Sequence, residues 1–149
     1  MGTDIYGWIE IHDYLYPGNW AGVVKVDSPL ILNNRNKQMY TFLFSVDFIY
    51  ENALAKNRGM PENVSSEFKA TQNELAGHSV SWIEWEELSG IKWQERASRN
   101  FEGTQTKYIV VDNDFEVILT GGWELIFDLM RTLSTFHGSK NVRLVVGFL

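Results

Sequence analysis

Cysteine is absent from this 149-residue chain, which excludes disulfide bonds, thiolate zinc sites and cysteine nucleophiles. Histidine is scarce: only His12, His78 and His137 are present, and no two have the four-residue spacing that places two metal ligands on one helix face. We therefore expect no metal ion and no cofactor. A metal site assembled across the fold from His78, a second histidine and a carboxylate is the alternative.

The chain also lacks an excess of positive charge and a long hydrophobic run. Thirteen Lys and Arg residues against nineteen Asp and Glu residues give a net charge of −6. We therefore expect no binding to nucleic acid or to a membrane surface. The most apolar stretch, residues 40–50, is interrupted by Ser45 and Asp47 and is shorter than the roughly 20 residues that span a bilayer. The first residues lack the basic and apolar segments of a secretory signal, so we expect a cytoplasmic protein.

Aromatic residues are the one class in excess, with nine Phe, six Trp and six Tyr. The hydrophobic share of 44% and the charged share of 21% are ordinary for a globular protein. Domains most often have about 100–150 residues, so we expect residues 1–149 to form a single globular domain.

Alternation of apolar and polar residues in one segment, and runs of β-forming residues in five others, predict six β-strands. The clearest is 4–12, where Ile5, Gly7, Ile9 and Ile11 share one face. The last segment is so apolar that we expect it to pair inside a sheet rather than at an open edge. The other strands are expected at 20–26, 80–85, 107–111 and 115–120, with the last at 142–149.

Apolar residues at helical spacing predict helices over 39–54 and 122–136, and Ser65 or Ser66 can cap a third that ends at Leu75. A fourth is expected over 91–100, where Lys92, Arg96 and Arg99 would share one face. Strands and helices do not alternate regularly along the chain. The order predicts an α+β fold: a single mixed, largely antiparallel sheet, including 107–120, with helices packed on it.

Three segments stand out as motifs: MGTDIYGWIE at 1–10, RGMPENVS at 58–65 leading to HSVSW at 78–82, and VRLVV at 142–146. Together they resemble a family of small uncharacterised proteins from bacteria and their phages, for which no activity is known. Those proteins open M-G-x-D-I-H, carry R-G-x-P-x-x-V-S and H-S-x-S-W, and end on a V-R-[LI]-V strand. The resemblance covers most of the chain outside about 90–140. Tyr6 stands where the family commonly has histidine, which argues against a histidine-based enzyme.

The motifs contain five candidate site residues. Asp4, His78 and Ser79 are the catalytic candidates, and Arg58 and Trp82 are the ligand-binding candidates. We expect them to converge on one cleft at the end of the sheet, because loops on a rigid scaffold often carry function. The alternative is a separate local role for each: a hydrogen bond at a strand end, a helix C-terminal turn, a capped helix exit and a core indole.

Two hypotheses for the function remain open. The first is a binding module, monomer or homodimer, that holds a small ligand or a protein partner without turnover. The second is a small hydrolase acting on a nucleotide-like or phosphorylated substrate. In that hydrolase His78 would be the general base and Arg58 the anion clamp, while Asp4 or Glu10 would orient His78 or bind a metal. The shortage of histidine and cysteine favours the binding module.

Three closely spaced tryptophans could form a stacking platform for a ring: Trp82, Trp85 and Trp93. Alternation along a strand places Trp82 and Trp85 on opposite faces, so they cannot both line one surface. At least one of the three is expected to fill the core.

Overall fold

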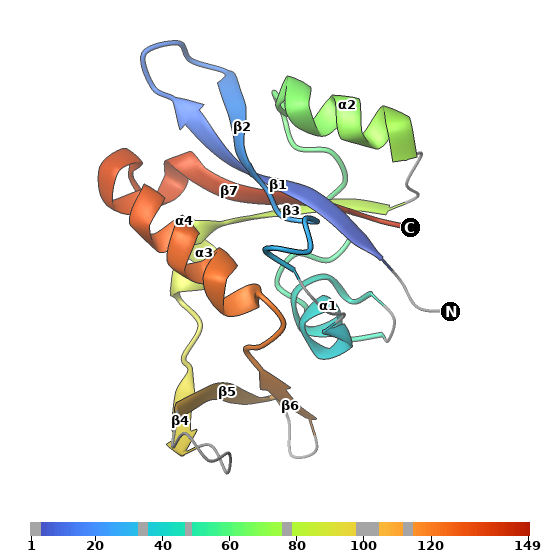
Figure 1. Cartoon of the computed structure of the whole chain (residues 1–149), viewed down its shortest axis with the longest axis vertical. Helices are drawn as coiled ribbons and strands as arrows, with labels where there is room; N and C mark the ends of the chain where they lie inside the picture. Colours follow the sequence, from blue (N-terminus) through green and yellow to red (C-terminus); the bar gives the residue numbers. More distant parts are fainter. Residues whose placement is uncertain (1–3, 33–35, 47–48, 76–78, 98–104, 112–114) are drawn as a thin grey trace.

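The computed structural model describes residues 4–32, 36–46, 49–75, 79–97, 105–111 and 115–149. It contains two antiparallel sheets, a four-stranded sheet of order β2-β1-β7-β3 and a three-stranded sheet of order β4-β5-β6 (Figure 1). The predicted α+β class is confirmed. The elements are β1 Ile5–Asp13, β2 Asn19–Lys25, α1 Lys37–Phe44, α2 Ser66–Leu75, β3 Ser79–Glu84, α3 Trp85–Ser89, β4 Gln94–Ala97, β5 Gln105–Val111, β6 Phe115–Ile118, α4 Trp123–His137 and β7 Val142–Phe148.

Strand β7 is the centre of the larger sheet. It pairs antiparallel with β1 on one side and with β3 on the other, and all seven of its residues are buried. The expectation that this strand pairs inside the sheet is confirmed. Its alternation sends Leu144, Val146 and Phe148 to one face and Arg143 and Val145 to the other, so each face of the sheet has its own core.

Helices cover both faces of this sheet (Figure 1). Helices α1 and α4 pack on the larger core, where the rings of Tyr40 and Phe44 contact Phe148 at centroid distances of 5.5 and 5.6 Å. Helix α2 covers the other face, where Phe68 stacks on Tyr6 at 5.8 Å. Ser65 caps α2, since its hydroxyl accepts a hydrogen bond from the backbone N–H of Phe68 at 3.1 Å.

The helix predicted over 39–54 is too long, because α1 ends at Phe44. Ser45 takes a left-handed conformation with φ 58°, and its N–H donates to the Thr41 carbonyl. The Ser45 hydroxyl then accepts a hydrogen bond from the N–H of Tyr50 at 2.8 Å. A serine side chain competes with the helix for backbone groups in this way, so the apolar periodicity beyond it does not continue the helix.

Two predictions for 91–120 are corrected. The helix expected over 91–100 is wrong, because Gln94–Ala97 is strand β4, paired with β5. The predicted hairpin exists as β5 and β6, but it belongs to the smaller sheet rather than to the main one. Pairing with a neighbouring strand outweighs the weak helical spacing of a few basic residues.

In the described part of the chain, no helix has the length and apolar character needed to cross a membrane.

Candidate functional site

Arg58 lies along the outer edge of strand β3. The N–H of Gly59 donates to the Val80 carbonyl at 3.0 Å, and the guanidinium of Arg58 donates to the Trp82 carbonyl at 3.2 Å. The segment around Arg58 therefore satisfies backbone acceptors of a strand that would otherwise have an open edge. The guanidinium also lies 5.0 Å from the centre of the Trp82 ring, so two of the five candidate residues are in contact.

The guanidinium of Arg58 is already engaged by a carboxylate. It donates to both oxygens of Glu87, at 2.7 and 2.5 Å, and to the Leu54 carbonyl at 2.7 Å. Hydrogen bonding to Glu87 raises the pKa of Arg58, and the same bond lowers the pKa of Glu87 below its ordinary value. As an anion clamp, Arg58 would first have to release this two-point partner.

The pair has a testable pH dependence. Because the pKa of Glu87 is lower in the folded state, the stability it contributes is present above its unfolded pKa of about 4.5 and is lost as the pH falls through the folded value. Glu87→Gln should lower the free energy of unfolding by about 1–2 kcal/mol at pH 7, and the deficit should shrink toward pH 3. Urea unfolding of the unsubstituted protein and of the variant at several pH values measures this difference in the free energy of unfolding. Exposed Glu86, replaced by Gln, is the control, and an equal change in both variants would contradict the assignment.

Of the three catalytic candidates, Asp4 and Ser79 lie at the same end of the large sheet, and His78 is not described. Ile5 and Ser79 both pair with Phe148, and the Asp4 carbonyl accepts a hydrogen bond from the N–H of Leu149. Asp4 and Ser79 therefore lie at the same end of the sheet, with Ile5 and Ser79 about 10 Å apart across β7. His78 lies outside the described residues, so its position relative to Arg58 stays a prediction.

Glu10 is not available to orient a histidine. Its side chain is fully buried, with one oxygen bonded by Arg143 Nε at 2.7 Å and the other by the Ser65 N–H at 2.9 Å. Arg143 in turn donates to the carbonyls of Glu62 and Asn63, and its guanidinium lies 3.7 Å from the centre of the Trp20 ring. This network joins β1, β7 and the start of α2, and its role is structural.

The candidate residues that were expected to share one cleft therefore lie at different positions along β3. Asp4 and Ser79 lie at one end of the sheet, whereas the guanidinium of Arg58 points away from that end, toward Trp82 and Glu87. Trp82 is half-buried and packs on the α2 face beside Val80 and Trp8.

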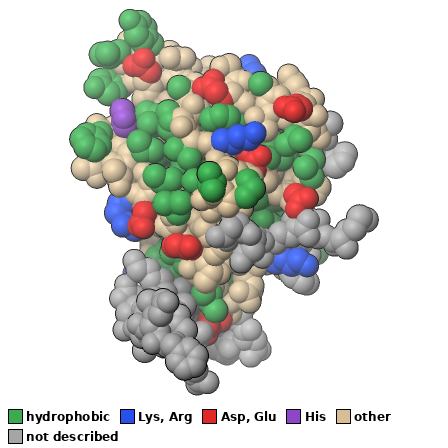
Figure 2. All heavy atoms as spheres, in the orientation of Figure 1, with side chains coloured by type: hydrophobic (Ala, Val, Ile, Leu, Met, Phe, Trp, Pro, Cys, Tyr) green, Lys and Arg blue, Asp and Glu red, His purple; other side chains and the backbone are tan. Residues whose placement is uncertain are grey.

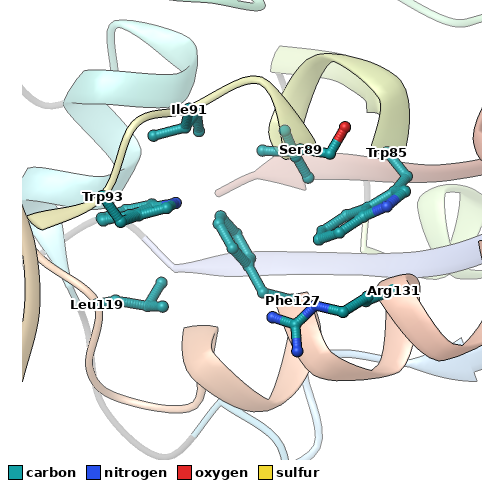
Figure 3. Close-up of a pocket in the computed structure, with 8 residues that line it drawn as sticks. Trp85, Ser89, Ile91, Trp93, Leu119, Phe127 and Arg131 are labelled. Atoms are coloured by element: carbon teal, nitrogen blue, oxygen red, sulfur yellow. The ribbon is translucent and has the colours of Figure 1, made fainter. Parts of the chain in front are cut away.

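A cavity of about 350 Å³ lies elsewhere, between α3, α4 and the segments that lead to and from the small sheet (Figure 3). The Phe127 ring stands between two indoles, with centroid distances of 6.1 Å to Trp85 and 5.6 Å to Trp93, both edge to face. Aromatic pairs favour this edge-to-face arrangement. The lining residues are Trp85, Leu88, Ser89, Ile91, Trp93, Leu119, Phe127 and Arg131.

The polar groups of this cavity are few. The Ser89 hydroxyl donates to the Glu86 carbonyl at 2.9 Å, and Arg131 forms an ion pair with Asp128 at 2.8 Å. Both partners of that pair have more than half of their side-chain surface exposed. Charged side chains of both signs are scattered over the visible face of the molecule, and neither forms a patch there (Figure 2). Among the described lining residues, Arg131 carries the charge at the cavity, and Asp128 is its ion-pair partner.

The close spacing of the three tryptophans in the sequence indicated part of this cavity wall but not the whole of it. The prediction that Trp82 and Trp85 face opposite ways is confirmed: Trp82 packs in the α2-side cluster and Trp85 in the larger core. Trp85 and Trp93 share the cavity wall, but Phe127 and Arg131, more than 30 residues later, complete it. Nothing in the spacing of Trp85 and Trp93 indicates those later partners.

Among the described residues, no group of three or more His, Asp or Glu side chains could hold a metal ion. No protein-family model, curated protein or solved structure matches the chain. The resemblance to the bacterial and phage family therefore stays a prediction based on the motifs.

Proposed function

We propose that this protein is a binding module that holds a small ligand in the cavity between α3 and α4, without turnover. The observation that carries the proposal is the cavity itself. At about 350 Å³ it falls at the lower end of the range for small-molecule sites, roughly 300–1,000 Å³. Its described wall is largely aromatic and aliphatic, and the polar groups of its side chains are a serine hydroxyl, a guanidinium and two indole N–H groups. That composition is typical of ligand sites.

The positions of the motif residues favour binding over hydrolysis. In the hydrolase hypothesis Arg58 holds a phosphate and Asp4 or Glu10 supports His78. Arg58 is bonded to Glu87, and Glu10 is bonded to Arg143 and Ser65. Each of these bonds would have to break before the group could serve a substrate.

Chemical shifts of the tryptophan indole N–H groups test the proposal. We expect small aromatic probes, indole and its acetate and amide derivatives, to shift the signals of Trp85 and Trp93. The Trp8 signal is an internal control, because its N–H is bonded to Thr71 under α2 on the opposite face. The probes should be recovered chemically unchanged after prolonged incubation.

A variant that fills the cavity completes the experiment. Ser89→Phe places a ring at an exposed lining position and should abolish the probe-induced shifts while leaving the spectrum folded. Shifts at Trp8 alone, no shifts with any probe, or conversion of the probes would each overturn the proposal.

A further inference from the structure

Among the described residues that line the cavity, Arg131 is the one with a cationic side chain. A guanidinium has five N–H donors in a fixed plane, and the described contact of Arg131 is its bond to Asp128. That pair is exposed and lies within one helical turn, so it contributes only about 0.2–1 kcal/mol. An anionic group entering beside Phe127 could therefore take donors from Arg131 at little cost.

The aromatic walls define the shape of the occupant. In Figure 3 the Trp93 nitrogen lies on the side facing Phe127, and no acceptor within the described residues bonds it. Phe127 is already in edge-to-face contact with both indoles, so the open space lies beside these rings, and a flat ring there can present its edge or its face to them. A cavity of about 350 Å³ equals the volume of about a dozen waters at about 30 Å³ each, so the occupant is compact.

We infer that the ligand class is a compact planar ring carrying one anionic group, with the ring against the wall formed by Trp85, Trp93 and Phe127 and the anion on Arg131. This inference rests on the proposed function, because it names what the same cavity selects. Aromatic carboxylates are the simplest members of this class. The aromatic walls supply hydrophobic burial, and the guanidinium supplies a charge-assisted hydrogen bond that a neutral analogue cannot form.

Indole-3-acetate and its neutral amide, indole-3-acetamide, separate the two contributions. Both have the same ring and nearly the same size, so they differ mainly in charge. We expect the acid to bind about three- to tenfold more tightly than the amide, the ratio that about 0.7–1.4 kcal/mol of charge-assisted bonding gives. Titration of the Trp85 and Trp93 indole signals measures both dissociation constants.

Substitutions at Arg131 test the assignment of the anion. Arg131→Gln should remove the preference for the acid without changing the affinity for the amide, and Arg131→Lys should restore part of it. Lys69→Gln, an exposed position on α2 at the opposite face, removes the same single charge and should leave the preference intact. That control separates local bonding from the net charge of the protein.

The outcomes distinguish the two proposals. Acid and amide bound equally at Trp85 and Trp93, with no effect of Arg131→Gln, would overturn the ligand class and leave the binding module standing. Equal losses of preference in Arg131→Gln and Lys69→Gln would also overturn it. Binding of neither probe would overturn the proposed function.

Discussion

Replacing Arg143 with methionine is expected to lower the free energy of unfolding by about 3–5 kcal/mol. Arg143 and Glu10 are both almost completely buried, with 5% and 0% of their side-chain surface exposed. Burial lowers the pKa of the Arg143 guanidinium, and the attraction of Glu10 opposes that shift. Methionine keeps much of the side-chain volume but leaves the carboxylate of Glu10 buried with only the Ser65 N–H as a partner.

A double variant isolates the uncompensated charge. Glu10→Gln combined with Arg143→Met removes both charges, so it should recover part of the loss, because a neutral amide is far cheaper to bury than an isolated carboxylate. Arg131→Gln breaks an exposed pair and should change stability by less than about 1 kcal/mol. A loss below about 1 kcal/mol in Arg143→Met would show that the buried pair is not a major contributor.

Gly122→Ala is expected to have a comparable effect, about 2–6 kcal/mol, at the start of α4. Gly122 has φ +100°, which costs a residue with a Cβ about 1–3 kcal/mol. A Cβ at this position would also lie 1.8 Å from the Ile31 carbonyl oxygen and 2.7 Å from its carbon. These are backbone atoms, so relief requires the loop around Ile31 to move away from the helix, which adds an overpacking cost of about 1–3 kcal/mol.

Gly59→Ala is the matched control. It has a similar left-handed conformation, with φ +76°, but a Cβ there would meet no atom within 4 Å. It should therefore show only the backbone cost, about 1–3 kcal/mol, without the added overpacking cost. Denaturant unfolding of both variants measures the difference. Equal losses would contradict the close approach of the 31–32 segment to the start of α4.

Local periodicity predicted the main elements because their burial is regular. The apolar spacing of α4 reflects its one buried face, whereas β7 is apolar throughout because helices cover both faces of the sheet, so all seven of its residues are buried. The same reasoning failed after Ser45, where one side chain redirects the backbone, and over 94–97, where pairing with β5 decides the conformation. The spacing of apolar residues within one segment does not reveal which other residues its backbone will bond to.

The candidate site was predictable only in parts. Two of the motif residues, Arg58 and Trp82, lie in contact, but the motif could not show that Glu87 occupies the guanidinium of Arg58, since Arg58 and Glu87 are 29 positions apart. The cavity is harder still to predict, because its wall joins residues of α3, the segment after α3, the segment after β6 and α4. Two of its tryptophans were conspicuous, yet Phe127 is indistinguishable in sequence from the other buried residues of α4.

The most direct test of the binding module is a search for intermolecular nuclear Overhauser effects in the complex with indole-3-acetate. The protons of the probe should give cross-peaks to the rings of Phe127, Trp93 and Trp85, since all three line the cavity. Cross-peaks to Trp8 or Trp20, on the α2 side of the sheet, or none from a probe added at saturating concentration, would contradict the proposal that the α3–α4 cavity is the ligand site.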